Sequence, residues 1–307
     1  MIGRQFDMVT ILGATASGKT DVAVNLAYKL GGEIISADSR QIYRNMNIGT
    51  GKDLEAYRLN GIGIPYHLID IADAGYQYNV FEYQRDFLKV YNDLKAKNIF
   101  PVMCGGSGMY LEAVLKGYRM VQVPVNENRR VELQLLTLDQ LTGILKSYKT
   151  INNTSDIETK KRALRAIEIE EYRIAHPEAD FSFPAINSLI VGVIYDRESR
   201  RRRITFRLKQ RLETGMIEEV ERLLERGLKP EDLTYYGLEY KYLTLYITGQ
   251  LTYDEMENGL NIAIHQFAKR QMTWFRKMER EGFTIHWLDG YMPMNEKTDK
   301  ILSLLTL

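Results

Sequence analysis

Short apolar runs alternate with longer amphipathic stretches over the first third of the chain, and another apolar run appears near residue 190. The runs have the length and residue types of buried strands, while the stretches repeat apolar positions with the period of a helix. We expect strands at Val9–Leu12, Glu33–Ser36, His67–Ile71, Ile99–Cys104 and Ser188–Tyr195, and helices at Asp21–Leu30, Val80–Lys97 and Ser107–Lys116. This alternation predicts an α/β fold with a mainly parallel sheet flanked by helices, in which ligands bind at the carboxyl ends of the strands.

The pattern changes in the middle of the chain, where no strand is expected. Short helices are expected there at Arg129–Leu136, Leu138–Tyr148 and Asp156–Ile174. We interpret residues 122–185 as a helical insertion in a core formed by residues 1–121 and 186–307. Two long amphipathic helices should follow, Arg200–Arg226 and Asp254–Glu281, with Gly215, Gly227 and Gly282 as glycine breaks.

Composition narrows the class of protein. The 307 residues are 45% hydrophobic and 26% charged, which is typical of a soluble globular protein. The single cysteine, Cys104, excludes an internal disulfide and a multi-cysteine zinc site, and favours a reducing cytoplasm. No stretch has the length and apolarity of a signal peptide or a membrane span, so we expect no membrane segment.

The net charge of +1 gives no overall field that would attract a polyanion. Basic residues nevertheless cluster locally, at Lys160–Arg162, at Arg200–Arg203 and at Lys269–Arg270. Solvated helix faces are the default explanation for such clusters. Contacts with nucleic acid phosphates are the alternative, and the 20 tyrosines and 10 phenylalanines would add surfaces for base stacking.

One motif points directly to phosphate chemistry. The pattern G-x-x-x-x-G-K-[ST] is matched in full by Gly13, Ala14, Thr15, Ala16, Ser17, Gly18, Lys19 and Thr20. It follows an apolar run and precedes a helical stretch, so that backbone amides and a helix N-terminus should surround a phosphate group. Lys19 would add a cation, and the Thr20 hydroxyl would ligate Mg²⁺. The alternative is a glycine turn without a ligand.

Two further segments follow expected strands and so belong to the same edge of the sheet. Asp38 comes directly after the second strand, where it could act as a general base, hold Mg²⁺ through water or cap a helix. The glycine-rich turn 104–110 contains Ser107, whose hydroxyl could donate a hydrogen bond to a ligand. The residues alone do not decide among these roles.

Together, these segments closely resemble the tRNA dimethylallyltransferases, also called tRNA isopentenyltransferases. The matching segments are GATASGKT at 13–20, SADSRQIYRNMNIGTGK at 36–52, CGGSGMYLEAVLKG at 104–117, KRALRAIE at 161–168, GMIEEVERLL at 215–224 and HQFAKRQMTWFRK at 265–277. The resemblance implies a P-loop NTPase-like core with a helical insertion that contacts tRNA. It also implies transfer of a dimethylallyl group from dimethylallyl diphosphate to the exocyclic amine of the adenosine immediately 3′ of the anticodon, without consumption of ATP.

The resemblance also implies roles for individual residues. Asp38 would be the general base, with Lys19, Thr20 and Mg²⁺ stabilising the departing diphosphate. Residues 13–20 would bind the diphosphate with Lys241, which stands where relatives usually have an arginine. Contacts with the tRNA anticodon stem-loop would come from Asp38, Ser39, Arg40, Gln41, Ser107, Glu158, Thr159, Lys160, Lys161, Arg162, Lys269 and Arg270. We expect a cytoplasmic monomer.

Three other functions remain open from the sequence. The phosphate loop alone would also suit a small-molecule or nucleotide kinase, which would consume ATP. A similar core could prenylate free adenine nucleotides, although such a substrate would need neither the insertion nor the basic C-terminal helix. An RNA-binding protein with a degenerate nucleotide site is the non-enzymatic alternative, against which Lys19, Thr20 and Asp38 argue because all three are intact.

Overall fold

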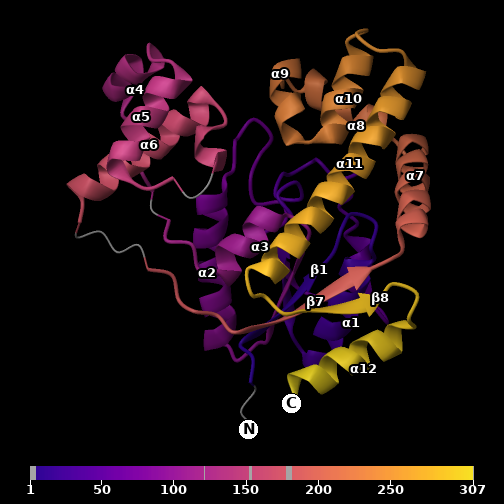
Figure 1. The fold of residues 1–307 in the computed structure, drawn as a ribbon. Coiled ribbons are helices and arrows are strands. Elements are labelled where there is room, and N and C mark those ends of the chain that lie inside the picture. Colours follow the sequence, from indigo (N-terminus) through magenta and orange to yellow (C-terminus); the bar gives the residue numbers. More distant parts are fainter. Residues whose placement is uncertain (1–4, 121, 152–153, 178–181, 307) are drawn as a thin grey trace. The chain divides into compact units, whose positions relative to one another are not determined.

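The computed structural model of the chain describes residues 5–120, 122–151, 154–177 and 182–306. The chain divides into two compact units (Figure 1). The larger unit contains Met1–Tyr118 and Pro184–Leu307, and the smaller unit contains Arg119–Phe183. The smaller unit corresponds to the expected insertion, residues 122–185, but begins three residues earlier and ends two residues earlier. Residue 121, the expected end of the first core segment, lies outside the described residues.

A six-stranded parallel sheet forms the centre of the larger unit. Its strand order is β5 (Tyr66–His67), β2 (Glu33–Ala37), β6 (Pro101–Gly105), β1 (Met8–Leu12), β7 (Ser188–Ile194) and β8 (Ile285–Asp289). Val9 of β1 is in register with Val102 of β6 on one side and with Leu189 of β7 on the other. All residues of β1 and β6 are buried, as expected for central strands covered on both faces. The parallel α/β fold expected from the sequence is therefore confirmed.

Helices cover both faces of this sheet, and alternate residues of β6 show how. Val102 and Cys104 belong to the core cluster that includes α1 (Lys19–Leu30) and α12 (Met294–Leu305). Met103 points the other way, and its Sδ accepts a hydrogen bond from the hydroxyl of Tyr83 in α2 (Val80–Ala96) at 3.8 Å. This alternation is the period of a strand, and it explains why apolar residues run continuously along β6.

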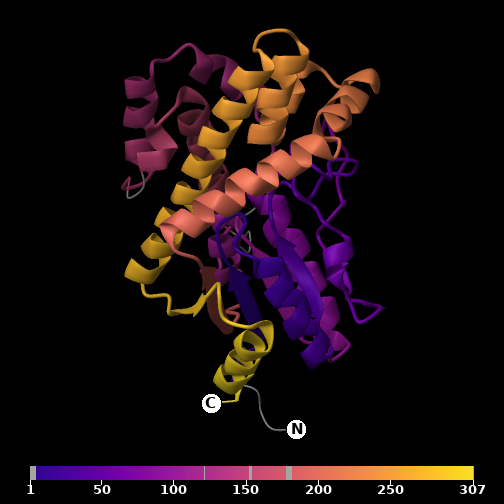
Figure 2. The same ribbon diagram turned by 90° about the vertical axis from the view of Figure 1, so that its right-hand side faces the viewer.

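Many of the remaining elements of the larger unit lie beyond the carboxyl ends of the strands, whereas residues 55–59 pack against α1. Figure 2 shows α7 crossing α11, and the two helices are in contact. The elements are η1 (Glu55–Tyr57), β3 (Arg58–Leu59), β4 (Ile62–Gly63), α3 (Gly108–Leu115), α7 (Arg197–Glu213), α8 (Met216–Glu225), α9 (Pro230–Leu233), η3 (Thr234–Tyr236), α10 (Leu238–Ile247) and α11 (Tyr253–Arg280). Thr252 begins α11 with a capping box to Glu255, which satisfies backbone amides that the helix leaves free.

The smaller unit is helical in its described residues. It contains α4 (Glu127–Gln134), α5 (Leu138–Tyr148), η2 (Thr154–Ile157) and α6 (Lys160–Ala175). Its own apolar core includes Leu133, Leu141, Leu145, Ala163 and Ile167. Each of the three α-helices therefore contributes to a core that is separate from that of the sheet.

Two expectations about elements were wrong. The strand expected at His67–Ile71 is only Tyr66–His67, because Leu68 and Asp70 have φ values of 61° and 55° and leave the extended conformation. The single helix expected at Arg200–Arg226 is broken into α7 and α8 at Gly215, whose φ is 100°. Among the described residues, no helix is long and apolar enough to span a membrane.

Candidate active site

The phosphate loop connects β1 to α1 at the carboxyl edge of the sheet. Gly18 and Ala16 both have positive φ values, 76° and 61°, and the Ser17 amide donates to the Ala14 carbonyl oxygen at 3.2 Å. A Cβ atom at Gly13 would clash with Ser17 Oγ, so the tight turn requires glycine there. These features give the loop the compact shape in which backbone amides surround an anion.

Two side chains from the C-terminal half of the chain support this loop. Gln271 of α11 is buried; its Oε1 accepts from the Thr15 amide at 2.9 Å, and its Nε2 donates to the Gly106 carbonyl at 2.8 Å. Arg203 of α7 donates from Nε to the Ala16 carbonyl at 2.9 Å. Gln271 was part of a sequence motif that gave it no role, and the structure shows that it connects the phosphate loop to the turn after β6.

A pocket of about 350 Å³ opens above the loop and lies within the larger unit. Most predicted site residues of the larger unit line it: Thr15, Lys19, Thr20, Asp38, Ser39, Arg40, Gln41, Ser107, Lys241 and Arg270. Burial, only partly opposed by Asp38, lowers the pKa of Lys19. The pocket thus places a poorly solvated cation near a carboxylate.

Asp38 follows β2 and leaves one carboxylate oxygen available. Its Oδ1 accepts from the Arg40 amide at 2.9 Å, and the described residues offer no hydrogen bond to Oδ2. Ser107, at the start of α3, accepts from the Ser39 amide at 2.9 Å. A Cβ atom at Gly105 would overlap the Ala37 carbonyl, so the ends of β2 and β6 approach closely. The Asp38 side chain thus closes a turn with the Arg40 amide and does not cap a helix, one of the roles left open by the sequence.

Two arginines to which sequence analysis assigned no role reach the same pocket. Arg207 and Arg211 are one turn apart on α7 and line the pocket beside Gly51. A Cβ atom at Gly51 would overlap the Arg211 guanidinium, and the φ of Gly51 is 66°. Burial, followed by repulsion from Arg211, lowers the pKa of Arg207 to about 10. The sequence feature that could have indicated both residues is their spacing of four positions on a basic helix, which places them on the same helix face.

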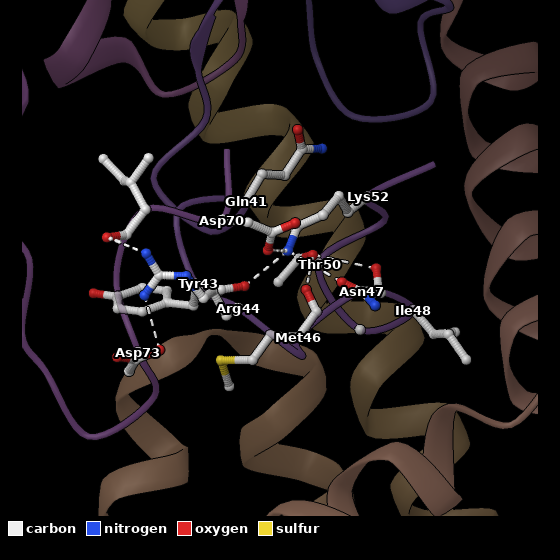
Figure 3. Close-up of polar contacts among 12 residues, drawn as sticks. Gln41, Tyr43, Arg44, Met46, Asn47, Ile48, Thr50, Lys52, Asp70 and Asp73 are labelled. Atoms are coloured by element: carbon white, nitrogen blue, oxygen red, sulfur yellow. Dashed lines mark hydrogen bonds and ion pairs between the residues drawn. The ribbon is translucent and has the colours of Figure 1, made fainter. Parts of the chain in front are cut away.

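The segment from Gln41 to Lys52 forms one wall of the pocket. The side chain of Lys52 anchors this segment through hydrogen bonds. Figure 3 shows Lys52 Nζ donating to the Tyr43 carbonyl at 2.7 Å, to Asn47 Oδ1 at 3.1 Å and to Asp70. Lys52 is buried, and burial lowers its pKa despite the Asp70 carboxylate. A buried cation with three oxygen partners fixes the path of this wall.

Glu219 of α8 provides a second anchor for the same wall. This buried carboxylate accepts from three consecutive backbone amides, those of Asn47 and Ile48 at 2.8 Å and that of Gly49 at 2.9 Å. The Tyr240 hydroxyl donates to its Oε1 at 2.7 Å. Glu219 therefore has four donors and determines where Gly49, which lines the pocket, is placed.

Oxygen donors of the type that Mg²⁺ prefers gather at the opening beside the phosphate loop. A second hollow, of about 230 Å³, is lined by Thr20, Asp21 and Asp53. Burial, followed by the Asp53 charge, raises the pKa of Asp21. No group of three or more acidic, histidine or cysteine side chains forms a metal site among the described residues. A hydroxyl and two carboxylates nevertheless suit Mg²⁺, which usually takes its other ligands from water and phosphate.

Some predicted site residues lie at the margin of this pocket or outside it. Lys241 lines it, but its side chain is exposed and its Nζ lies 6.0 Å from the Tyr242 ring centre. Lys269 is exposed on α11 and does not line the pocket. The predicted residues Glu158, Thr159, Lys160, Lys161 and Arg162 belong to the smaller unit.

Within the smaller unit, these five residues surround the start of α6. Thr159 caps the helix by accepting from the Arg162 amide at 3.3 Å, and Arg162 forms an ion pair with Glu158. Lys160 Nζ donates to the Gln134 carbonyl at 3.1 Å. Their predicted contacts with tRNA stay a prediction.

Comparisons with known proteins give a consistent result. The sequence model of the family described as IPP transferase matches residues 41–278, and that described as isopentenyl transferase matches residues 6–66. The chain is 65% identical over 292 residues to tRNA dimethylallyltransferase 2 of Bacteroides fragilis, with 95% of each chain covered. It is 60% identical over 302 residues to the enzyme of the same name from Phocaeicola vulgatus, with 98% of each covered.

Solved structures agree with these sequence matches. The full-length tRNA isopentenylpyrophosphate transferase of Bacillus halodurans is 28% identical and has a TM-score of 0.71, with 98% of this chain and 95% of that chain covered. A eukaryotic dimethylallyltransferase acting on tRNA has a TM-score of 0.76 at 21% identity, covering 92% and 73%, and supports the fold alone. With this fold, this phosphate loop and these relatives, the chain belongs to the IPP transferase family, that of the tRNA dimethylallyltransferases.

Proposed function

We propose that this protein transfers a dimethylallyl group from dimethylallyl diphosphate to the exocyclic N6 amine of the adenosine immediately 3′ of the anticodon in tRNA. The observation that carries the proposal is the pocket itself. It places the phosphate loop and the free Oδ2 of Asp38 around one space of about 350 Å³. The family membership of the chain selects the donor and the acceptor.

The donor half of the pocket binds the diphosphate. The amides of residues 13–20, Lys19 and Arg207 surround the place where negative charge develops as the bond from the allylic carbon to the diphosphate oxygen breaks. Groups fixed in this way stabilise the leaving group more strongly than water does. Thr20, Asp21 and Asp53 would hold Mg²⁺, which neutralises diphosphate charge when bound. Lys241 would contribute a further cation at the other side of the pocket.

The acceptor half of the pocket receives the adenine. The adenine amine is a weak nucleophile because its lone pair is delocalised into the ring, so a base must take its proton as the new bond from nitrogen to carbon forms. Asp38 Oδ2 accepts that proton. Ser39, Arg40, Gln41 and Ser107 lie around it and can orient the base. Such a base must leave its stack in the anticodon loop to enter the pocket.

Basic residues on α6 and α11 would bind the tRNA backbone. Lys160, Lys161 and Arg162 at the start of α6, together with Lys269 and Arg270 of α11, supply cations for phosphate contacts. Glu158, through its ion pair with Arg162, and Thr159, which caps α6, would position the basic residues at the start of that helix. Contacts of this type give affinity that falls with salt and does not depend on sequence.

The test is transfer of label from dimethylallyl diphosphate to tRNA that lacks the modification, with Mg²⁺ and without ATP. Parallel reactions contain AMP, or a tRNA whose target adenosine is replaced by guanosine. Label only in the intact tRNA is the expected result. Label in AMP would identify an enzyme that acts on free nucleotides, and no label in any acceptor would refute the proposed reaction.

A further inference from the structure

An ion pair in the pocket wall has no part in the reaction described above. Arg211 Nη1 and Glu239 Oε1 are 3.9 Å apart, and their side chains are only 18% and 21% exposed. Both residues line the pocket. At this separation the charges attract each other without a hydrogen bond. The carboxylate therefore holds the guanidinium loosely, and an anion that forms direct hydrogen bonds could replace it.

The surroundings of Arg211 show why it needs an acidic neighbour. Arg207 and Arg211 lie one helical turn apart, and both guanidinium groups approach Gly51. Two like charges at this spacing repel each other. Among the described residues, Glu239 is the acidic group that forms an ion pair with Arg211, and no ion pair involves Arg207. The pocket thus holds two clustered guanidinium groups and one carboxylate that offsets part of their charge.

We propose that Glu239 competes with diphosphate for Arg211 and thereby promotes release of the diphosphate product. The proposal rests on the proposed function, because it takes diphosphate as the group that leaves. With the pocket free of donor, Arg211 pairs with Glu239. With diphosphate on the phosphate loop, Arg211 turns to its oxygens, and the partly buried Glu239 carboxylate loses its ion-pair partner and keeps only the weaker attraction of Arg40 and a backbone hydrogen bond. That state has a higher energy than it would have without Glu239, so diphosphate binds less tightly.

The test is calorimetric titration of inorganic diphosphate, with Mg²⁺ and without tRNA, into the wild type and the variant Glu239→Gln. Glutamine has nearly the same shape as glutamate and removes only the charge. We expect the variant to bind diphosphate roughly tenfold more tightly. Glu221→Gln, an exposed position on α8 that does not line the pocket, makes the same change in net charge and should bind as the wild type does.

A second pair of variants tests whether Glu239 acts through Arg211. In an Arg211→Gln background, the added change Glu239→Gln should alter diphosphate affinity by less than about threefold, because the competition has been removed. Equal tightening in both backgrounds would overturn the competition for Arg211. Glu239→Asp retains the charge and should bind closer to wild type than to Glu239→Gln.

The remaining outcomes separate this proposal from the proposed function. Unchanged or weaker diphosphate binding by Glu239→Gln would overturn the role of Glu239, and weaker binding would mean that Glu239 holds Arg211 in place for the donor. Either result leaves the transfer reaction intact. A wild-type protein that binds no diphosphate would overturn both.

Discussion

Replacing Glu219 by glutamine should lower the free energy of unfolding, because this side chain holds the pocket wall at residues 47–49 in place. The carboxylate accepts from the amides of Asn47, Ile48 and Gly49 and from the Tyr240 hydroxyl. A glutamine at this position has one acceptor oxygen, which can keep the two bonds now made to Oε2. Its NH₂ group would then face the Gly49 amide, and two donors would oppose each other in a buried place.

The size of the effect follows from these bonds. A hydrogen bond to a charged group contributes about 1.5–3 kcal/mol, and a buried donor left without a partner costs about 1–3 kcal/mol. One unsatisfied amide and two weakened bonds give an expected loss of about 3 kcal/mol in the free energy of unfolding. The pocket should change as well: because Gly49 and the following two residues form its wall, the KM for the donor should rise.

Denaturant unfolding of wild type and Glu219→Gln, followed by circular dichroism, measures the loss of stability. The control is Glu218→Gln, the neighbouring residue on the same helix, whose side chain is exposed and which should lose less than about 0.5 kcal/mol. A loss below about 1 kcal/mol for Glu219→Gln would show that the four donors do not depend on the carboxylate. An unchanged donor KM would show that Glu219 does not position the wall.

Four further predictions concern the chemistry and the phosphate loop. Asp38→Ala should lower turnover roughly a hundredfold or more while tRNA affinity in a filter-binding assay stays near that of the wild type, and near-normal turnover would remove Asp38 from its role as base. Arg207→Lys keeps the charge but loses the planar fork, so the KM for dimethylallyl diphosphate should rise about tenfold, whereas an unchanged KM would place the diphosphate elsewhere. Thr20→Val should raise the Mg²⁺ concentration needed for half-maximal activity, with an unchanged requirement arguing against the hydroxyl as a ligand. Gln271→Leu should lower the free energy of unfolding by about 2–4 kcal/mol, because the Thr15 amide and the Gly106 carbonyl lose their partner; equal stability would mean that water replaces both bonds.

The sequence was most informative where structure and chemistry are local. The phosphate loop needs a fixed order of glycine, lysine and threonine over eight positions, so its place after β1 could be predicted before the fold was known. Asp38 and Ser107 were found by a similar argument, because each directly follows an apolar strand. All three segments line the pocket.

The residues that hold the pocket together were less accessible to sequence analysis. Glu219, Gln271 and Glu239 each act on groups far away along the chain, and the residue patterns of their helices do not indicate those partners. Strand β8 was missed because its five residues, which follow a long helix, show neither a continuous apolar run nor a regular alternation of apolar and polar types. Periodicity indicates which face of an element is buried, and it does not indicate which element will cover that face.

The position of Gln271 in the chain has a consequence for synthesis on the ribosome. It joins the phosphate loop to the turn after β6 and does so from α11, 256 residues after Thr15 in the chain. The loop must therefore wait, without this support, until most of the chain has been translated. The two glycine-rich turns at the carboxyl edge of the sheet are therefore joined only once α11 has left the exit tunnel and packed against them.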